Sequence, residues 1–139
     1  QISFEARDSE FVDSKSGVSA RMSITAYQNL ISTAERRALK LGVNRTTVRL
    51  ADFMGIIPAL TGKVELVYEG EQEGPFQVAY NLLEKTFRTV FGHYFPSPET
   101  KKKRGKEPAV DNPYRSVITW FDKGNHLDVL FNASDKDKP

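Results

Sequence analysis

Residues 24–42 read ITAYQNLISTAERRALKLG, and this stretch decides the fold class. Its apolar side chains recur at intervals of three and four residues, which is the period of one face of an α-helix. They are Ile24, Tyr27, Leu30, Ile31, Ala34, Ala38 and Leu41. Ser23 is expected to cap the start of this helix with its hydroxyl, and Gly42 is expected to end it. The sequence therefore predicts a helix over 24–41 as the central element of a mainly α fold.

Two further stretches have the same period. A shorter helix is predicted over 50–57, with Thr47 or Asp52 as its candidate cap and Pro58 as the residue that kinks or ends it. A long helix is predicted over 75–94, because Pro75 suits a first helical position. An aromatic and aliphatic stripe runs along it, and we expect that stripe to be buried because in water it would expose a large apolar patch. Its members are Phe76, Ala79, Tyr80, Leu83, Phe87, Val90, Phe91 and Tyr94.

The remaining segments are shorter. Residues 2–12 are compatible with a helix, residues 63–68 with a short strand or a helix, and residues 69–74 with an acidic loop. Residues 117–121 and 126–131 each have the alternating residue pattern of a β-strand and are separated by a turn, which is typical of a β-hairpin. Trp120 is expected to anchor this hairpin in the core. The predicted fold is a bundle of about four helices followed by this hairpin, which packs on the aromatic face of helix 75–94.

Composition limits the classes of function. The chain has 139 residues, 20 Lys and Arg against 18 Asp and Glu, no cysteine and two histidines, His93 and His126. The small net charge gives no whole-surface field for nucleic acid or anionic lipid, and without cysteine there are no disulfides, thiolate metal sites or Cys nucleophiles. No apolar run approaches the roughly 20 residues of a membrane span. A cytoplasmic protein is expected, and because Gln1 opens the chain without Met we expect a piece of a longer one.

One loop attracts a functional interpretation. Residues 15–21 read KSGVSAR and place a glycine, hydroxyls and Arg21 immediately before the long helix. A guanidinium held at a helix start can bind phosphate oxygens with two parallel hydrogen bonds. The alternative is a surface arginine that pairs locally.

The chain resembles the C-terminal lid region of an AAA+ ATPase, of the kind found in the magnesium chelatase I subunit and chelatase-like bacterial proteins. The residues that carry the resemblance are FEARDSE at 4–10, KSGVSAR at 15–21, AERRA at 34–38 and IPALTGKVELVYEGE at 57–71. It covers residues 2–95, and the hairpin loosely. It implies a lid-like helical region over 1–62 that carries the sensor 2 motif, followed by a C-terminal extension over 63–139.

The resemblance also implies a function. Such proteins hydrolyse ATP with Mg²⁺ in a ring, usually hexameric, and an α/β core upstream of the lid holds the nucleotide. Arg21 matches the sensor 2 arginine that reaches the γ-phosphate, whereas Lys15, Ser16 and Ser19 match only as flanking residues. This chain lacks a P-loop and a Walker B acid run. The piece itself is therefore expected to be inactive without the core. The resemblance identifies neither the protein client of the ring nor whether the ring takes part in tetrapyrrole chelation.

Three other features invite a function. The acidic segment with Glu65, Glu69, Glu71 and Glu73 lacks the ligand pattern of a calcium loop, so a solvated or partner-facing surface is expected. The basic run 101–106 supports a rival interpretation, a stand-alone protein-interaction or nucleic-acid-binding module, although it lacks the interleaved aromatic residues of single-strand binders. His93 and His126 are expected to be packing or surface residues, and no nucleophile–base pair of an independent enzyme can be assembled.

Overall fold

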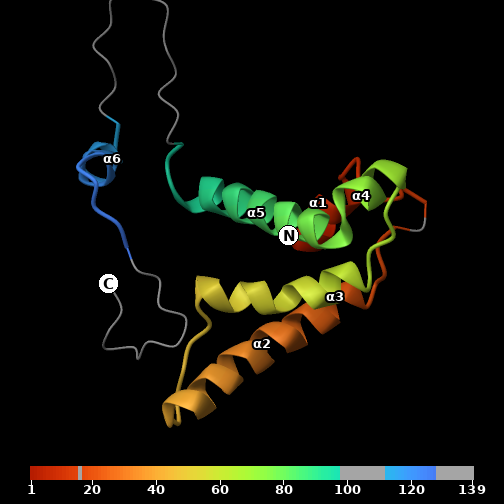
Figure 1. Cartoon of the computed structure of the whole chain (residues 1–139), viewed down its shortest axis with the longest axis horizontal. Helices are drawn as coiled ribbons and strands as arrows, with labels where there is room; N and C mark the ends of the chain where they lie inside the picture. Colours follow the sequence, from red (N-terminus) through yellow and green to blue (C-terminus); the bar gives the residue numbers. More distant parts are fainter. Residues whose placement is uncertain (16, 98–111, 128–139) are drawn as a thin grey trace, which may run out of the picture.

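The computed structural model describes residues 1–15, 17–97 and 112–127, and these residues form a small helical bundle. Short helices η1 and α3 form a middle layer between the long helices α2 and α5, while α1 packs against α2 and α5 (Figure 1). The elements are α1 (Ile2–Arg7), α2 (Met22–Leu41), the 3₁₀-helix η1 (Leu50–Ile56), α3 (Ile57–Thr61), α4 (Tyr68–Glu73), α5 (Pro75–Tyr94) and α6 (Arg115–Asp122).

The core lies where α1, α2, α3 and α5 meet. Met22 and Leu60 are fully buried, and aliphatic side chains from both long helices surround them. The other buried apolar residues are Ala6, Val12, Ala26, Ile56, Ile57, Ala59, Val78, Ala79, Leu82 and Leu83. Residues on both sides of the division expected between 62 and 63 thus share one apolar core.

The central helix prediction is confirmed. Helix α2 ends at Gly42, which has φ 64° and ψ 27°, a left-handed conformation that costs glycine little. The cap prediction is wrong, because Arg21 is the N-cap residue and no side chain caps this end. Ser23 lies inside the first turn instead, where its Oγ is 2.6 Å from the Oγ of Ser3 in α1.

The buried face of α2 differs from the predicted stripe. Ile24 and Tyr27 are 61% and 66% exposed, whereas the buried positions are mostly small. The reason is the close approach of η1, since a Cβ added at Gly55 would stand 2.1 Å from Oγ1 of Thr33. A face of large side chains would hold the two elements too far apart for this contact.

The predicted helix over 50–57 is present as η1, but its N-cap residue is Arg49 and not one of the candidates Thr47 and Asp52. Asp52 acts from the third helical position instead. The Asp52 carboxylate accepts a hydrogen bond from the Arg49 backbone N–H at 2.8 Å. Pro58 does not end the helical path. It lies in the first turn of α3, where a missing N–H costs no hydrogen bond.

Helix α5 is confirmed from Pro75 to Tyr94, but its predicted aromatic stripe is only partly buried. The buried face is aliphatic and consists of Val78, Ala79, Leu82 and Leu83, with Phe87 packed at its margin. Phe76 and Tyr94 are 60% and 79% exposed. The neighbouring helices are short, so they cover only the aliphatic arc and leave most rings outside.

Two segments near the N-terminus and the middle of the chain also differ from prediction. Helix α1 ends at Arg7, and residues 11–13 run on without helix. The predicted acidic loop is the helix α4, which buries Gly70. A Cβ at Gly70 would stand 2.4 Å from the carbonyl oxygen of Phe11, so glycine lets α4 lie directly on this chain segment.

The expected hairpin is wrong in its first half. Residues 117–121 belong to helix α6, and Trp120 is 41% exposed instead of anchoring a core. Tyr114, Val117, Ile118 and Phe121 are spaced i, i+3, i+4 and i+7, so the same apolar residues satisfy a helical period as well as alternation. Residues 128–131 of the second expected strand lie outside the described residues.

Candidate functional site

Arg21 lies at the start of the long helix α2, as its N-cap residue. Its side chain is exposed, while its backbone is fixed on both sides. The Arg21 N–H donates to Oγ of Ser19 at 3.3 Å, and the Arg21 carbonyl accepts from the N–H and hydroxyl of Thr25 at 3.0 and 3.1 Å. No ion pair involves the Arg21 guanidinium in the part of the chain that the structure describes. A fixed backbone and an exposed cation suit the binding of an anion supplied from outside this chain.

The loop that carries Arg21 is paired with a distant segment. Val12 and Val18 form antiparallel bridges with Leu66 and Val64, respectively. We call this pairing of residues 11–19 with 63–67 the seam. Among its described residues, four backbone hydrogen bonds run from Asp13 N–H to Glu65 O (3.0 Å), Glu65 N–H to Gly17 O (2.8 Å), Ser19 N–H to Lys63 O (3.0 Å) and Val67 N–H to Phe11 O (3.1 Å). The open question over 63–68 is thus settled as extended chain up to Val67, not as a helix.

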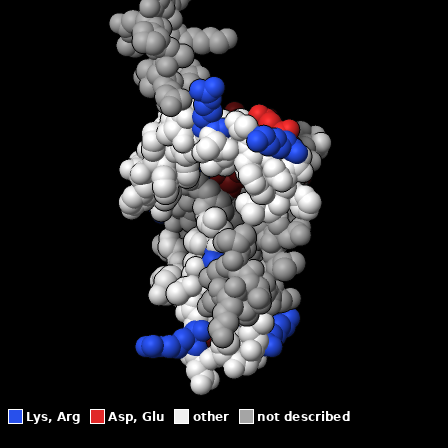
Figure 2. Space-filling model, turned by 90° about the vertical axis from the view of Figure 1, so that its left-hand side faces the viewer, with Lys and Arg blue, Asp and Glu red and all other residues white. Residues whose placement is uncertain are grey.

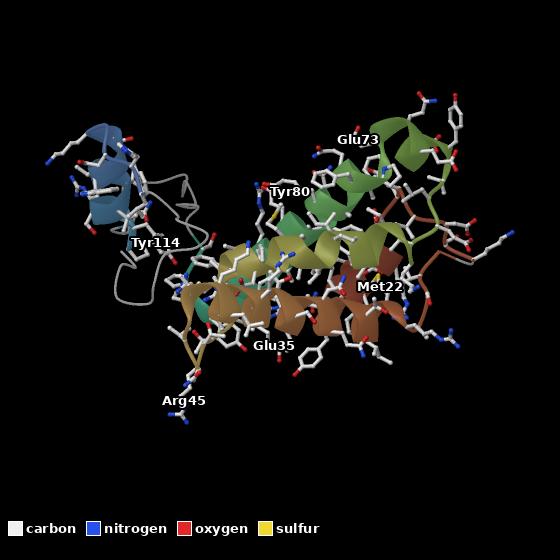
Figure 3. All side chains as sticks on the ribbon, turned by 60° about the horizontal axis from the view of Figure 1, so that its bottom comes forward. Met22, Glu35, Arg45, Glu73, Tyr80 and Tyr114 are labelled. Carbon is white, nitrogen blue, oxygen red and sulfur yellow. The ribbon has the colours of Figure 1, made fainter. Side chains whose placement is uncertain are left out.

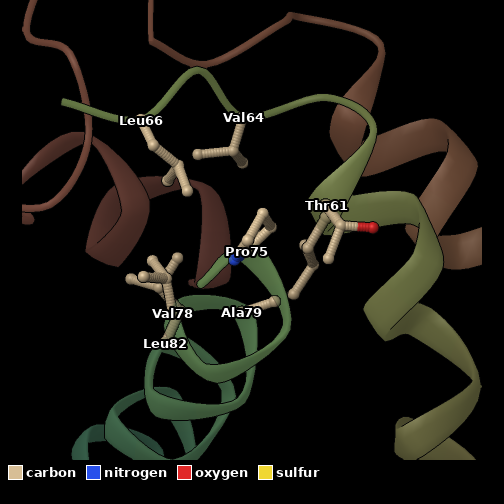
Figure 4. A pocket seen from close by; sticks show the side chains of 8 residues that line it. Thr61, Val64, Leu66, Pro75, Val78, Ala79 and Leu82 are labelled. Atoms are coloured by element: carbon tan, nitrogen blue, oxygen red, sulfur yellow. The ribbon is translucent and has the colours of Figure 1, made fainter. Parts of the chain in front are cut away.

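The seam also rests on α5. A small apolar pocket lies between them, and Figure 4 shows Val64 and Leu66 from the seam facing Val78 and Leu82 from α5. Its remaining lining residues are Leu60, Thr61, Pro75 and Ala79. A second, more polar hollow opens beside the Arg21 loop, between Ser19 and residues 61–65. The seam therefore connects the Arg21 loop mechanically to the start of α5.

An exposed apolar patch continues from Arg21 along α2. Ile24 and Tyr27 follow Arg21 at intervals of three residues, which places them along one side of the helix. Phe4 of α1, 63% exposed, belongs to the same end of the molecule because Ser3 contacts Ser23. We call Phe4, Ile24 and Tyr27 the outer patch. Sequence reasoning missed it because it grouped Ile24 and Tyr27 with Ala34 and Ala38 in one apolar stripe.

A buried ion pair holds the far half of α2. Arg37 and Asp52 are 4% and 0% exposed, and Arg37 also donates to Oγ1 of Thr46 at 2.9 Å and to the carbonyl of Thr47 at 2.8 Å. Burial raises the pKa of the Asp52 carboxyl, but hydrogen bonds from Arg37 and from the Arg49 N–H outweigh it and leave that pKa below its usual value. This network fixes the connection between α2 and η1, and all its charge is used internally.

A second carboxylate ties α1 to α5. Glu5 accepts hydrogen bonds from Gln1 Nε2 at 2.9 Å and Thr89 Oγ1 at 3.0 Å, and pairs with Lys85 Nζ at 3.2 Å. These bonds from Gln1, Lys85 and Thr89 lower the pKa of the Glu5 carboxyl. Glu5 is therefore a structural group rather than a catalytic acid.

The other candidate residues are dispersed over the surface. Glu65, Glu69, Glu71 and Glu73 are exposed, and across the described ranges no group of three or more acidic or histidine side chains could hold a metal ion. His93 and His126 are exposed as well. The basic run 101–106 and Ser16 lie outside the described residues. Of the sequence-based candidates, only Arg21 thus acquires a defined setting.

Comparison with known proteins leaves the resemblance as an interpretation. No protein-family model, curated protein or solved structure matches the chain. Among the helices that the structure describes, none combines the length and apolar character needed to cross a membrane.

Proposed function

We propose that this chain is the C-terminal lid region of a chelatase-like AAA+ ATPase and that Arg21 contacts the γ-phosphate of ATP held by an upstream α/β core. The observation that carries the proposal is the setting of Arg21. It is an exposed cation at the N-terminus of a 20-residue helix, where the helix dipole also favours negative charge. The two stretches most specific to the resemblance, 16–21 and 62–71, meet in the seam that holds this loop.

The chemistry assigned to Arg21 is electrostatic. A guanidinium can stabilise charge on the oxygens of a transferred phosphoryl group through charge-assisted hydrogen bonds. ATP and Mg²⁺ would be held by the core, since the P-loop and Walker B residues are missing from this chain. The chain alone is therefore proposed to be inactive, and Arg21 acts only in the assembled protein.

The outer patch supplies the contact that such a role needs. Ile24 and Tyr27 follow Arg21 along α2, Phe4 lies in the neighbouring α1, and all three are more than half exposed. Covering an exposed apolar patch next to a functional residue is a common use of such surfaces. We assign the patch to contact with the upstream core, within a ring-shaped homo-oligomer that acts on a protein client.

Arg21→Ala in the full-length parent tests the proposal. Loss of one contact to developing charge is expected to lower ATP turnover on the order of a hundredfold. The matched control is Arg45→Ala, because Arg45 is an exposed arginine beyond the opposite end of α2, and Figure 3 shows it at the far end of that helix from Met22. Turnover that is equal in Arg21→Ala and Arg45→Ala would remove the sensor assignment.

A stability measurement separates chemistry from folding. Arg21 is exposed and its side chain contributes no ion pair within the described residues, so Arg21→Ala is expected to change the free energy of unfolding of this chain by less than about 0.5 kcal/mol. A large loss of stability would instead make Arg21 a structural residue.

A further inference from the structure

Helix α6 has an apolar face that is largely exposed among the residues that the structure describes. Val117, Ile118 and Phe121 project from one side of the helix and are 51%, 44% and 46% exposed. The opposite side carries the polar residues Ser116 and Thr119, and Arg115 and Asp122 flank the apolar face. No residue of α6 is buried. An amphipathic helix of this kind normally covers apolar surface on a neighbouring element.

Helix α6 is nevertheless attached to the bundle at its first turn. The hydroxyl of Tyr114, the N-cap residue, donates to the carbonyl oxygen of Pro96 at 2.8 Å. The Tyr114 ring also lies 6.1 Å, centroid to centroid, from the ring of Phe91 near the end of α5. Tyr114 is spaced three and four residues from Val117 and Ile118, so the contact with α5 is made by the edge of the same apolar face.

The end of the bundle next to Tyr114 is itself apolar. Phe91 and Phe95 stack with centroids 4.6 Å apart and are 40% and 53% exposed. Leu50 and Met54 of η1 are 74% and 38% exposed. We call these four residues the apolar end.

Contacts one turn deeper in the bundle show that the apolar end is one surface. Phe53 of η1 meets Phe87 of α5 edge to face at 5.1 Å. Leu50 precedes Phe53 by one 3₁₀ turn, and Phe91 follows Phe87 by about one α turn, on helices that run in opposite directions (Figure 1). Seen from this side, most of the Lys and Arg side chains in view lie toward the upper and lower margins (Figure 2).

We infer that the apolar end is the docking site for the apolar face of α6 of the same chain, with Asn112–Tyr114 as the pivot. The two surfaces match in chemistry, and the Tyr114–Phe91 contact already forms one edge of their interface. Closure about this pivot would bring Val117, Ile118 and Phe121 onto Leu50 and Phe95. The inference does not depend on the proposed ATPase function.

The same chain is a better occupant than a second copy. Helix α6 is tethered at Tyr114, so its local concentration at the apolar end is set by the chain and far exceeds that of another molecule in dilute solution. Part of the ordering cost is also already met, because Tyr114 is bonded to Pro96. A second copy would have to displace this contact or add to it.

Trp120 provides a direct probe, because it is the only tryptophan in the chain and lies at the edge of the apolar face of α6. Docking is expected to shift its fluorescence to shorter wavelength and to slow its quenching by iodide. Phe91→Ser should reverse both effects. The matched control is Phe76→Ser, an exposed phenylalanine at the opposite end of α5, which should leave Trp120 unchanged.

Ile118→Asp keeps the test decisive if Phe91→Ser disturbs the bundle, since α6 contributes nothing to the buried core. It should produce the same shift as Phe91→Ser. Emission typical of a fully hydrated indole in the unmodified chain, or equal emission in all variants, would overturn the inference.

Engineered cysteines identify the occupant, because the chain has none of its own. Leu50→Cys combined with Phe121→Cys should form a disulfide within one molecule, at a rate that does not change on dilution. Phe76→Cys combined with Phe121→Cys is the control pair and should form none. A disulfide that appears only between molecules, and disappears on dilution, would show docking between copies and would overturn the assignment to the same chain.

Discussion

Arg37 and Asp52 form a buried, two-point ion pair between α2 and η1. Arg37 Nε donates to Oδ1 of Asp52 at 3.1 Å, and Nη2 donates to Oδ2 at 2.7 Å. Asp52 also accepts a hydrogen bond from the Arg49 N–H, and Arg37 also donates to Thr46 and Thr47. Separating the two side chains would leave two uncompensated charges in the interior. The pair therefore fixes the geometry of the turn between these helices.

Removal of one partner is expected to be costly. Asp52→Ala should reduce the free energy of unfolding by about 3–5 kcal/mol, since Arg37 would be left buried and uncompensated. Urea unfolding followed by circular dichroism measures this loss. Glu84→Ala is the control, because Glu84 pairs with Arg88 on the exposed surface of α5 and should cost less than about 0.5 kcal/mol. Similar losses for both variants would contradict a special role for the buried pair.

Glycine at position 55 is expected to be required for helix packing. In Gly55→Ala the new methyl group would collide with Oγ1 of Thr33, and overpacking of this kind costs about 1–3 kcal/mol. Gly92→Ala is the comparison, because a Cβ at Gly92 in α5 meets nothing within 4 Å. Alanine there should be neutral or stabilise by up to about 1 kcal/mol. Thermal melts of the two variants should therefore move in different directions or by clearly different amounts.

The two low-pKa carboxyls predict loss of stability in acid. The folded-state pKa lies below the ordinary values of 4.5 for Glu5 and 3.8 for Asp52. The unfolded chain thus binds protons more readily, so this stabilisation is complete above the ordinary pKa and is lost as the pH falls through the folded-state pKa. We expect the free energy of unfolding to fall below about pH 4.5.

Glu5→Gln should make that fall less steep, because one of the two linked groups no longer titrates. Glu10→Gln, a substitution of an exposed glutamate outside the Glu5 network, should retain the profile of the unmodified chain. A fall of equal steepness in Glu5→Gln and in the unmodified chain would show that Glu5 does not carry the effect.

The seam is expected to depend on backbone hydrogen bonds. Glu65→Pro removes the N–H that donates to the Gly17 carbonyl, whereas Glu65→Ala retains it. The proline variant should lose about 1–3 kcal/mol more stability than the alanine variant. Amide hydrogen exchange should also accelerate at Asp13 and Ser19 in Glu65→Pro. Unchanged exchange at these two amides would mean that the bridges hold without Glu65.

The sequence predicts a helix well where the apolar residues keep a single helical period over a long stretch. Helices 24–41 and 75–94 were predictable because their apolar intervals extend over five turns or more. The segment 114–121 was not, since its apolar residues satisfy alternation and the helical period together. Helix α4 also escaped prediction, because its glycine disfavours a helix. The structure shows that Gly70 instead allows close backbone contact with Phe11.

The burial of individual faces was harder to predict than the helices themselves. Periodicity groups Ile24 with Ala34 and Ala38, but the contact between Thr33 and Gly55 selects a face of small residues and turns Ile24 outward. One signal of the buried ion pair was available in the sequence, because Arg37 lies directly beside Ala38 of the predicted apolar stripe. Its partner Asp52 was recognisable only as a cap, because pairing between distant residues leaves no periodic trace.

The seam makes α2 a lever. Arg21 lies next to the seam, where the chain is pinned, whereas Gly42 lies 20 helical residues away, a distance of about 30 Å. A tilt of about 10° around this fulcrum would move the far end of α2 by about 5 Å while Arg21 barely changes place. Small changes in the angle of α2 at the Arg21 loop would thus become displacements of several ångströms at the turn after Gly42.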